Sequence, residues 1–139
     1  MGYGELLHKS EQRTISPAIC VYIDANGLYE LNNERGHEAG DLMLRFVAES
    51  LMEQFPKGSL YRIGGDEFVV FPAPAEGQTC EDRMRSASAS ITAQGYSISY
   101  GIAAHESVVG LRELVREADE KMLESKRAYY AEHDRRVRK

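Results

Sequence analysis

Cysteine is scarce in this sequence, and the few copies lie outside any motif that would give them a structural task. Only two of the 139 residues are cysteines. Cys20 lies in an apolar stretch and Cys80 in a polar one, and neither belongs to a CxxC or histidine-rich motif. The pattern excludes a disulfide-stabilised scaffold and indicates two free thiols in a reducing compartment.

Basic residues are also in deficit. The 17 lysines and arginines face 22 acidic residues, which gives a formal net charge of -5. A general nucleic-acid-binding surface normally carries a basic excess, so we expect no nucleic-acid partner. A bound nucleotide would instead depend on metal ions and on a few well-placed cations.

Long apolar runs are absent. No stretch approaches the roughly 20 apolar residues of a membrane-spanning helix, and the N-terminal residues lack the apolar core of a signal peptide. We therefore expect this segment to be soluble and cytoplasmic, while the full-length protein can still be membrane-anchored through other segments. The length and the 42% of hydrophobic residues fit a single domain, residues 1–139, with its own core.

The apolar residues that are present follow the periods of strands and helices. Residues 18–23 form a continuous apolar run, which is typical of a central strand covered on both faces. Alternation over residues 96–103 predicts a half-buried strand. Helical spacing and polar breaks predict a short helix near 3–9, a polar turn at 13–16, helices at 27–34, 41–55, 78–93 and 111–130, and a turn at 36–40.

Apolar stripes mark the expected buried faces of two of these helices. The stripes contain Leu42, Phe46, Val47 and Leu51 in the first, and Leu111, Leu114, Val115, Ala118, Met122 and Leu123 in the second. The chain end has the composition of a frayed basic tail, with Arg135, Arg136, Arg138 and Lys139. The order of elements predicts an α+β fold, an α/β sandwich in which helices flank a mostly antiparallel central sheet.

The stretch L-Y-R-I-G-G-D-E-F-V-V-F, residues 60–71, predicts a β-hairpin. Its tip contains Gly64, Gly65, Asp66 and Glu67. Paired glycines allow positive φ and the close approach of another molecule, and the two carboxylates are the hard oxygen ligands that magnesium prefers. A plain solvent-exposed turn would use the same residues, so the tip alone does not decide between the two interpretations.

A further acid, Asp24, ends the apolar run of residues 18–23. If that strand lies beside the hairpin, Asp24 and Asp66 meet at the same edge of the sheet, where they would repel each other without a cation between them. The arrangement suits magnesium that bridges nucleotide phosphates, as in phosphoryl and nucleotidyl transfer. The backbone N–H groups of residues 25–28 are available to the same phosphates.

Three spaced motifs carry a resemblance to a known family. They are D-A-N-G-L-Y-E-L-N-N-E-R-G-H-E-A-G-D at 24–41, R-I-G-G-D-E-F at 62–68 and A-D-E-K-M-L-E-S-K at 118–126. Together they resemble the GGDEF family of diguanylate cyclases over nearly the whole chain. The resemblance implies a fold similar to the nucleotidyl cyclase palm. It also implies condensation of two GTP molecules into cyclic di-GMP with release of pyrophosphate, and two Mg²⁺ or Mn²⁺ ions per active site.

The resemblance also assigns roles to single residues. Asp24, Asp66 and the carbonyl of Ala25 match the metal ligands. Asp66 or Glu67 would deprotonate or orient the attacking 3′-hydroxyl, and the choice between them stays open. The substrate-binding positions are Asn32 and Asp41 for guanine, His37 near the substrate, Gly64 and Gly65 where the backbone passes the nucleotide, and Lys126 at the phosphates. A carboxylate at Asp41 can accept the N1 and N2 hydrogens of guanine, which adenine lacks.

Each role has a structural alternative. Asp24 can serve as the cap of the next helix, and Asn32 can serve to terminate one. His37 can be an ordinary turn residue, and Lys126 can be a solvated lysine on a charged helix face. Tyr130 and its neighbour Tyr129 are interpreted as packing residues.

The chain departs from the family pattern at several positions. Tyr29 and Tyr130 stand where many members place a phosphate-contacting lysine and arginine, which removes positive charge near the triphosphate. Phe55 and Gly58 stand where the R-x-x-D of the product-inhibition site would be, so we expect no feedback through that site. The Asp-x-Leu-Thr segment that usually opens the family is missing, which predicts a domain excised from a larger sensor protein.

Three functions are therefore weighed. The first is an active cyclase that works as a homodimer, because each domain resembles half of a catalyst with one GTP. The second is a degenerate domain that binds GTP as a regulatory ligand without turnover, which the two tyrosines favour. The third is a structural dimerisation domain, which the retained carboxylates disfavour.

Overall fold

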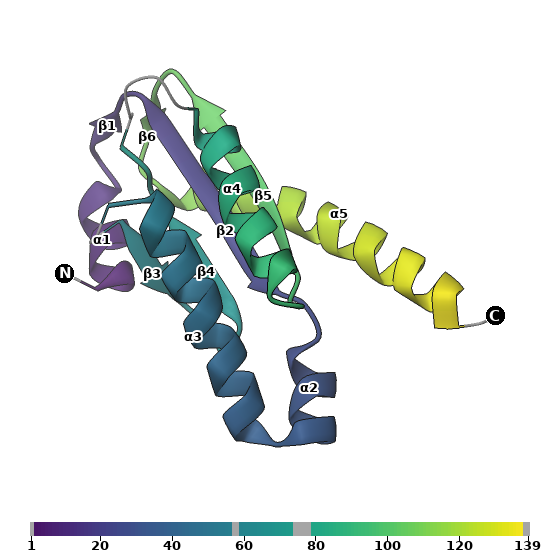
Figure 1. Cartoon of the computed structure of the whole chain (residues 1–139). Helices are drawn as coiled ribbons and strands as arrows, with labels where there is room; N and C mark the ends of the chain where they lie inside the picture. Colours follow the sequence, from purple (N-terminus) through teal and green to yellow (C-terminus); the bar gives the residue numbers. More distant parts are fainter. Residues whose placement is uncertain (1, 57–58, 74–78, 138–139) are drawn as a thin grey trace.

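The structure, a computed structural model, describes residues 2–56, 59–73 and 79–137. Its central feature is a four-stranded sheet in the order β3-β4-β2-β5, in which every neighbouring pair is antiparallel (Figure 1). The strands are β2 (Ala18–Ala25), β3 (Leu60–Arg62), β4 (Glu67–Val70) and β5 (Ile98–His105). The predicted α+β sandwich with an antiparallel sheet is confirmed.

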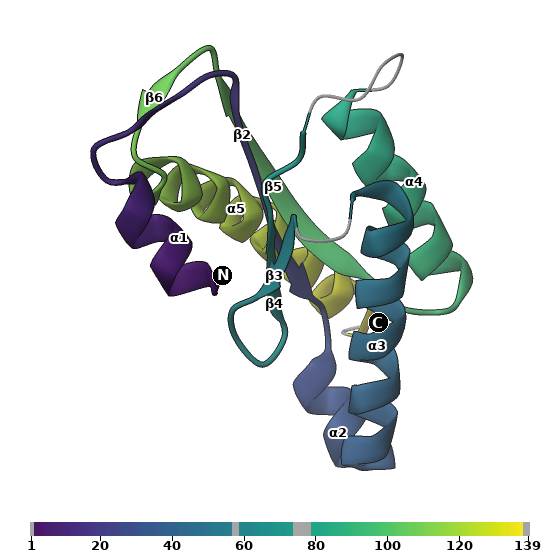
Figure 2. The same ribbon diagram turned by 90° about the vertical axis from the view of Figure 1, so that its left-hand side faces the viewer.

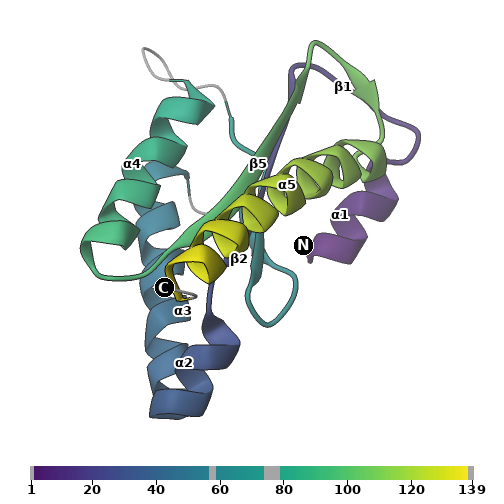
Figure 3. The ribbon, with the colours of Figure 1, turned by 90° about the vertical axis from the view of Figure 1, so that its right-hand side faces the viewer.

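Helices cover both faces of this sheet (Figures 2 and 3). On one face lie α3 (His37–Gln54) and α4 (Cys80–Ala93), and on the other lie α1 (Tyr3–Ser10) and α5 (Arg112–Val137). The short α2 (Leu28–Arg35) packs against α3 beyond the end of β2. A small second sheet pairs β1 (Thr14–Ile15) with β6 (Val108–Val109).

Two apolar clusters fill the space between the helices and the sheet. Because side chains alternate along a strand, β2 contributes to both clusters. Val21 and Ile23 belong to the cluster under α3 and α4, whereas Cys20 and Tyr22 belong to the cluster under α5. Asp24 continues the second set, so its carboxylate lies on the α5 side of the sheet.

Glycine allows the closest approach between α5 and the sheet. A Cβ built on Gly101 of β5 would lie 2.4 Å from the carbonyl oxygen of Ala118 and 2.4 Å from the amide nitrogen of Met122. Both are backbone atoms of α5, which have little room to move. Gly101 therefore sets the spacing between this strand and the helix that carries Lys126.

Several sequence-based boundaries were wrong. The predicted turn at 36–40 is reduced to Gly36, whose φ of 88° reverses the chain between α2 and α3, and the following residues are helical. The predicted polar turn at 13–16 contains strand β1. Helix α5 includes Arg135 and Arg136, which had been expected in a frayed tail, whereas residues 138–139 and Gln78 lie outside the described residues.

Two stripe residues were also misplaced. Leu42 is 57% exposed and Leu123 is 37% exposed, so neither belongs to the core. In α3 the buried neighbours of Leu42 are Met43 and Leu44, because the sequence pattern did not separate these three adjacent apolar residues. The remaining members of the α5 stripe are buried as predicted: Leu111, Leu114, Val115, Ala118 and Met122.

No helix among the described residues combines the length and the apolar character needed to cross a membrane.

Candidate functional site

The end of β2 and the β3–β4 hairpin meet at one edge of the sheet. The register pairs Asp24 of β2 with Glu67 of β4, and the amide of Ala25 donates to the backbone oxygen of Asp66 at 2.9 Å. Asp24 is the last-but-one residue of β2, and Asp66 directly precedes β4. Thus carboxylates that are more than 40 residues apart in the sequence become neighbours.

Asp24 is the buried centre of this group. Its side chain is 3% exposed, and the ammonium of Lys126 lies 2.7 Å from its Oδ2. Oδ1 is buried and has no hydrogen-bond partner among the described residues. Burial raises the pKa of Asp24 to about 6, the hydrogen bond from Lys126 opposes this rise, and the charge of Asp66 adds to it. A buried carboxylate in this state would gain from a further cation.

Lys126 lies just past the middle of α5, far from Asp24 in the sequence. Burial lowers the pKa of its ammonium, but the hydrogen bond to Asp24 and the charges of Asp24 and Asp66 outweigh burial, so the pKa is raised. The lysine therefore stays charged at neutral pH. It is an ion-pair partner of the site, and the alternative of a merely solvated lysine is wrong.

Glu67 is held by a residue that the sequence analysis had not singled out. The hydroxyl of Tyr22 donates to Glu67 Oε2 at 2.9 Å, across neighbouring strands. Burial and this hydrogen bond raise the pKa of the Tyr22 phenol, so it remains a donor. The pKa of Asp119 in α5 is raised mainly by burial and further by the nearby charge of Glu67. The sequence signal that could have identified Tyr22 is its position inside an apolar run, because a buried tyrosine hydroxyl normally needs a hydrogen-bond partner.

The hairpin tip is braced by its own arginine. Arg62 donates from Nε to the backbone oxygen of Gly64 at 3.3 Å and from Nη2 to that of Gly65 at 2.7 Å. Gly64 and Gly65 are not among the glycines with positive φ, so the tip does not use the left-handed backbone that glycine allows. A Cβ on Gly64 would lie 2.8 Å from Glu67 Oε1, whereas a Cβ on Gly65 would meet nothing within 4 Å. The backbone at Gly65 is thus open to an approaching molecule.

The α2–α3 corner carries the polar residues matched to guanine binding. Asn32 packs over Gly40, where a Cβ would lie within 1.9 Å of Asn32 Oδ1, and this oxygen has no partner among the described residues. Asp41 lines an open cavity of about 440 Å³ together with Arg62 and Phe68. His37 is exposed at the first position of α3. The corner therefore presents the Asp41 carboxylate beside the hairpin, whereas the Asn32 oxygen is buried against Gly40.

The loop between β2 and α2 is fixed by side chains from distant elements. Asn26 donates to Ser97 Oγ at 3.0 Å and accepts from Ser99 Oγ at 2.9 Å. Gly27, with φ of 76°, donates its amide to the hydroxyl of Tyr130 at 3.2 Å. Tyr130 is therefore part of the site and does more than pack.

This geometry excludes two of the purely structural roles considered above. The N-cap of α2 is Gly27, so Asp24 does not cap that helix. Asn32 lies inside α2, which ends at Arg35, so it does not terminate the helix. Tyr29 is 75% exposed and brings no charge to the loop.

The carboxylates at this edge of the sheet fit a divalent metal ion that takes its remaining ligands from water and substrate. Among the described residues there is no group of three or more histidine, cysteine, aspartate or glutamate side chains placed to hold an ion. Asp24 and Asp66 supply two carboxylates, and magnesium is commonly held by one or two carboxylates with water and substrate phosphates. The unpartnered Oδ1 of Asp24 fits such an ion.

Comparison with known proteins identifies the family of the chain. Residues 4–131 match the family described as diguanylate cyclase, GGDEF domain. The diguanylate cyclase DgcS of Shewanella oneidensis is 30% identical over 122 residues, which make up 83% of this chain and 41% of DgcS. The chain thus spans less than half the length of this curated relative.

Solved structures show the same fold. The GGDEF domain of TpbB (YfiN) from Pseudomonas aeruginosa superposes with a TM-score of 0.66 at 28% identity, over 89% of this chain and 78% of that one. SiaD from the same species, solved in complex with its activator SiaC, gives a TM-score of 0.70 over 90% of this chain and 52% of that one, and at 19% identity it supports the fold alone. The palm-like α+β fold is confirmed, and the chain belongs to the GGDEF domain family of diguanylate cyclases.

Proposed function

We propose that this chain is the catalytic domain of an active diguanylate cyclase that condenses two GTP molecules into cyclic di-GMP and pyrophosphate. One observation carries the proposal. Asp24 is buried at the end of β2 with an unpartnered oxygen, beside Asp66 and in an ion pair with Lys126. The carboxylates of such a site are stabilised by a further cation, which a divalent metal ion supplies. The ammonium of Lys126 is a cation for the phosphate groups that the metal ion carries.

Mg²⁺ or Mn²⁺ fits Asp24, Asp66 and the Ala25 carbonyl. When bound, the metal supplies charge neutralisation at the phosphates and acidifies the attacking hydroxyl. Lys126 binds phosphate oxygens from the α5 side. The amides of residues 25–27 are already engaged within the protein, so the first-turn amides of α2, which precede the hydrogen bond from Leu31 to Gly27, donate to the same oxygens. The open backbone at Gly65 accommodates the nucleotide, and Gly64 lies next to it against the Glu67 side chain.

Guanine binds at the α2–α3 corner in this proposal. Asp41 accepts the N1 and N2 hydrogens of guanine, Asn32 hydrogen-bonds the base through its amide group, and His37 lies at the rim of the substrate. Adenine offers no donor at N1, so Asp41 would face an acceptor without a proton between them. The site therefore favours GTP over ATP.

The reaction needs a second copy of the domain with its own GTP. The 3′-oxygen of one nucleotide forms a bond to the α-phosphorus of the other, and the bond from that phosphorus to the bridging oxygen of pyrophosphate breaks. Asp66 or Glu67 receives the hydroxyl proton, and Tyr22 holds Glu67 in place. Repetition in the opposite direction closes the ring, so activity requires a homodimer. The activating signal would come from a sensor domain of the full-length protein.

A second candidate is a domain that binds GTP as a regulatory ligand without turnover. The observation that favours it is the engagement of the Gly27 amide by Tyr130, together with the exposed, uncharged Tyr29. Both features leave Lys126 as the principal cation near the triphosphate, and fewer cations mean weaker stabilisation of the charge that develops during transfer.

One experiment separates these functions. Purified protein is incubated with GTP and Mg²⁺ or Mn²⁺ at several protein concentrations, cyclic di-GMP is measured by chromatography, and GTP binding is measured by calorimetry. Product that rises more steeply than protein concentration supports the cyclase. GTP binding without product supports the regulatory domain. If neither product nor GTP binding is observed, the structural dimerisation domain is supported.

The site assignment is tested by a double variant. Asp66→Ala/Glu67→Ala should abolish product while the circular dichroism spectrum is retained. The matched control is Glu49→Ala/Glu53→Ala, which removes two exposed carboxylates of α3 and should keep activity. Product formation by the Asp66→Ala/Glu67→Ala protein would refute the assignment.

A further inference from the structure

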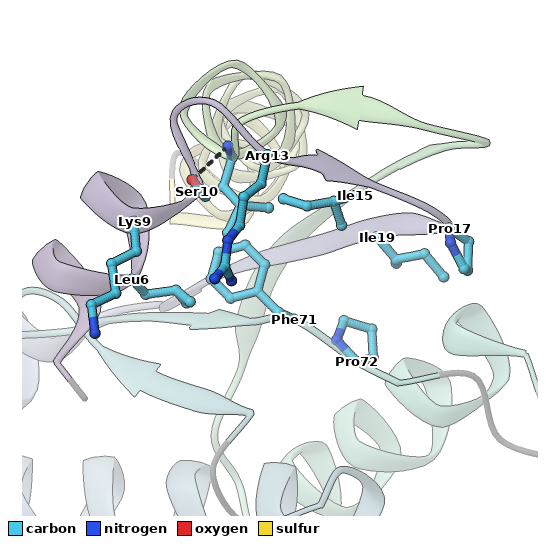
Figure 4. Close-up of a pocket in the computed structure, with 10 residues that line it drawn as sticks. Leu6, Lys9, Ser10, Arg13, Ile15, Pro17, Ile19, Phe71 and Pro72 are labelled. Atoms are coloured by element: carbon cyan, nitrogen blue, oxygen red, sulfur yellow. Dashed lines mark hydrogen bonds between the residues drawn. The ribbon is translucent and has the colours of Figure 1, made fainter.

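A second cavity, of about 310 Å³, lies between α1, β1, the start of β2 and the segment after β4 (Figure 4). Ile19 lines it and lies on the same strand as Asp24, five residues earlier. At the rise of an extended strand, this separation is about 17 Å. The cavity is therefore distinct from the candidate active site.

The walls of this cavity are mainly apolar. Leu6 of α1, Ile15 of β1, Ile19 of β2, and Phe71 and Pro72 after β4 contribute side chains from four separate segments (Figure 4). The volume falls at the lower end of the range of small-molecule sites, about 300 to 1,000 Å³. The space suits a ligand with a compact apolar body.

The charged groups of the cavity are all positive. Lys9 and Arg13 line it, and none of its lining residues is an aspartate or glutamate. Lys9 has an exposed pairing with Glu5 at 3.3 Å, which is a weak interaction in water. Within the described residues, no salt bridge includes Arg13, whose side chain extends into the cavity from the connection between α1 and β1 (Figure 4).

The one buried polar side chain of the cavity is already engaged. The hydroxyl of Ser10 donates to the backbone oxygen of Leu7 at 2.7 Å and accepts from the amide of Leu111 at 3.1 Å. Lys9 and Arg13 therefore remain as the side-chain groups that recognise a ligand. In a chain with a net charge of -5, such a locally positive cavity selects for an anion.

We propose that this cavity binds a small organic acid, with its apolar body against Leu6, Ile19 and Phe71 and its anionic head on Arg13 and Lys9. A guanidinium pairs with a carboxylate through two parallel hydrogen bonds, which gives the head a defined orientation. Aliphatic and aromatic acids share this chemistry, and the test distinguishes them.

The probe is 8-anilinonaphthalene-1-sulfonate, an aromatic anion that fluoresces in apolar sites. The chain has no tryptophan, so energy transfer from tryptophan does not complicate the signal. Saturable binding of one probe per chain is expected. In Lys9→Gln/Arg13→Gln the dissociation constant should rise about tenfold or more, because charge-assisted hydrogen bonds are lost.

The matched control is Arg85→Gln/Arg127→Gln, which removes two exposed cations elsewhere and should leave probe binding unchanged. A Leu6→Phe variant narrows the cavity without adding tryptophan and should also weaken binding. If that variant does not fold, the two surface double variants still decide the outcome.

Competition identifies the ligand class. Displacement of the probe by decanoate indicates an aliphatic acid, and displacement by 2-naphthoate indicates an aromatic one. The alcohol 1-decanol should displace the probe much less than decanoate does. The proposal is overturned by the absence of saturable binding, by equal binding in the Lys9→Gln/Arg13→Gln protein and the wild type, or by equal displacement by decanol and decanoate.

Discussion

At the scale of single residues, the site shows how a strand arranges polar chemistry next to a core. Tyr22 and Asp24 lie on the same side of β2, and each has a partner from another element: Glu67 for the phenol and Lys126 for the carboxylate. Because both side chains are buried, these hydrogen bonds fix their rotamers. The carboxylates are thereby oriented before any ligand arrives.

Tyr22→Phe tests this orientation. The variant keeps the ring in the core but removes the hydrogen bond to Glu67, so the free energy of unfolding should fall by about 1 kcal/mol. If Glu67 acts in the reaction, kcat should fall about tenfold while the affinity for GTP, measured by calorimetry, stays the same. The control Tyr61→Phe keeps its ring contacts with Tyr3 and Phe71 and should change neither value. If kcat of the Tyr22→Phe protein were unchanged, Tyr22 would not position Glu67 for the reaction.

The two thiols give a second prediction at this scale. Both cysteines are free, as predicted, and burial raises the pKa of Cys20 to about 12 and that of Cys80 to about 11. At pH 8 only about one thiol in a thousand is then ionised at Cys80, compared with about a quarter for an ordinary cysteine. Alkylation by iodoacetamide, followed by mass spectrometry, should be slow, should reach Cys80 before Cys20, and should accelerate steadily from pH 7 to pH 10. Rapid modification at pH 8 would contradict the burial.

At the scale of elements, the packing of α5 on β5 positions Lys126. Gly101→Ala places a Cβ 2.4 Å from two backbone atoms of α5, so the helix must shift away from the strand. We expect a loss of about 1–3 kcal/mol of stability, measured by urea unfolding. Gly4→Ala is the control, because a Cβ there meets nothing within 4 Å and alanine favours the helix. Equal stability of Gly101→Ala and the wild type would contradict the close approach.

The strands were predicted well because their signals are strong. The continuous run at 18–23 became β2, and the hairpin residues became β3 and β4, since a central strand and a glycine-marked reversal leave few alternatives. The strands β1 and β6 were missed because each has two residues, too few for any period. The turn between α2 and α3 was predicted too long, because Gly36 alone makes the turn while Gly40 serves helix packing.

The site was partly predictable from the residues themselves. The meeting of Asp24 with the hairpin follows from two neighbouring strands, and the structure brings them together. Lys126 entered only through the family resemblance, because nothing local in a charged helix distinguishes one lysine from another. The contacts of Tyr22 and Tyr130 depend on tertiary packing, so sequence spacing did not reveal them.

At the scale of the whole molecule, the fold places two kinds of candidate site at opposite ends of β2. One end joins β2, the hairpin and α5 around carboxylates, and the other joins α1, β1 and β2 around apolar side chains and two cations. A ligand that binds the folded protein and not the unfolded chain stabilises the fold, so binding at either end should be visible as a gain in global stability.

Metal binding provides the sharpest test of that expectation at the acidic end. A divalent ion that binds only the folded protein stabilises it by RT ln(1 + [L]/Kd), which is about 1.4 kcal/mol at ten times Kd. For a domain of this size, that corresponds to a rise of about 4–6 °C in Tm. Mn²⁺ added to the metal-free wild type should produce such a rise in differential scanning fluorimetry.

Asp24→Asn should lose this response, because a neutral amide replaces the buried carboxylate whose Oδ1 lacks a partner. Asp82→Asn, an exposed change near the start of α4, is the matched control and should respond like the wild type. If the Asp24→Asn protein showed the same rise in Tm, the ion would bind elsewhere. The carboxylates at the edge of the sheet would then not be the metal site, and the proposed phosphate chemistry would lose its basis.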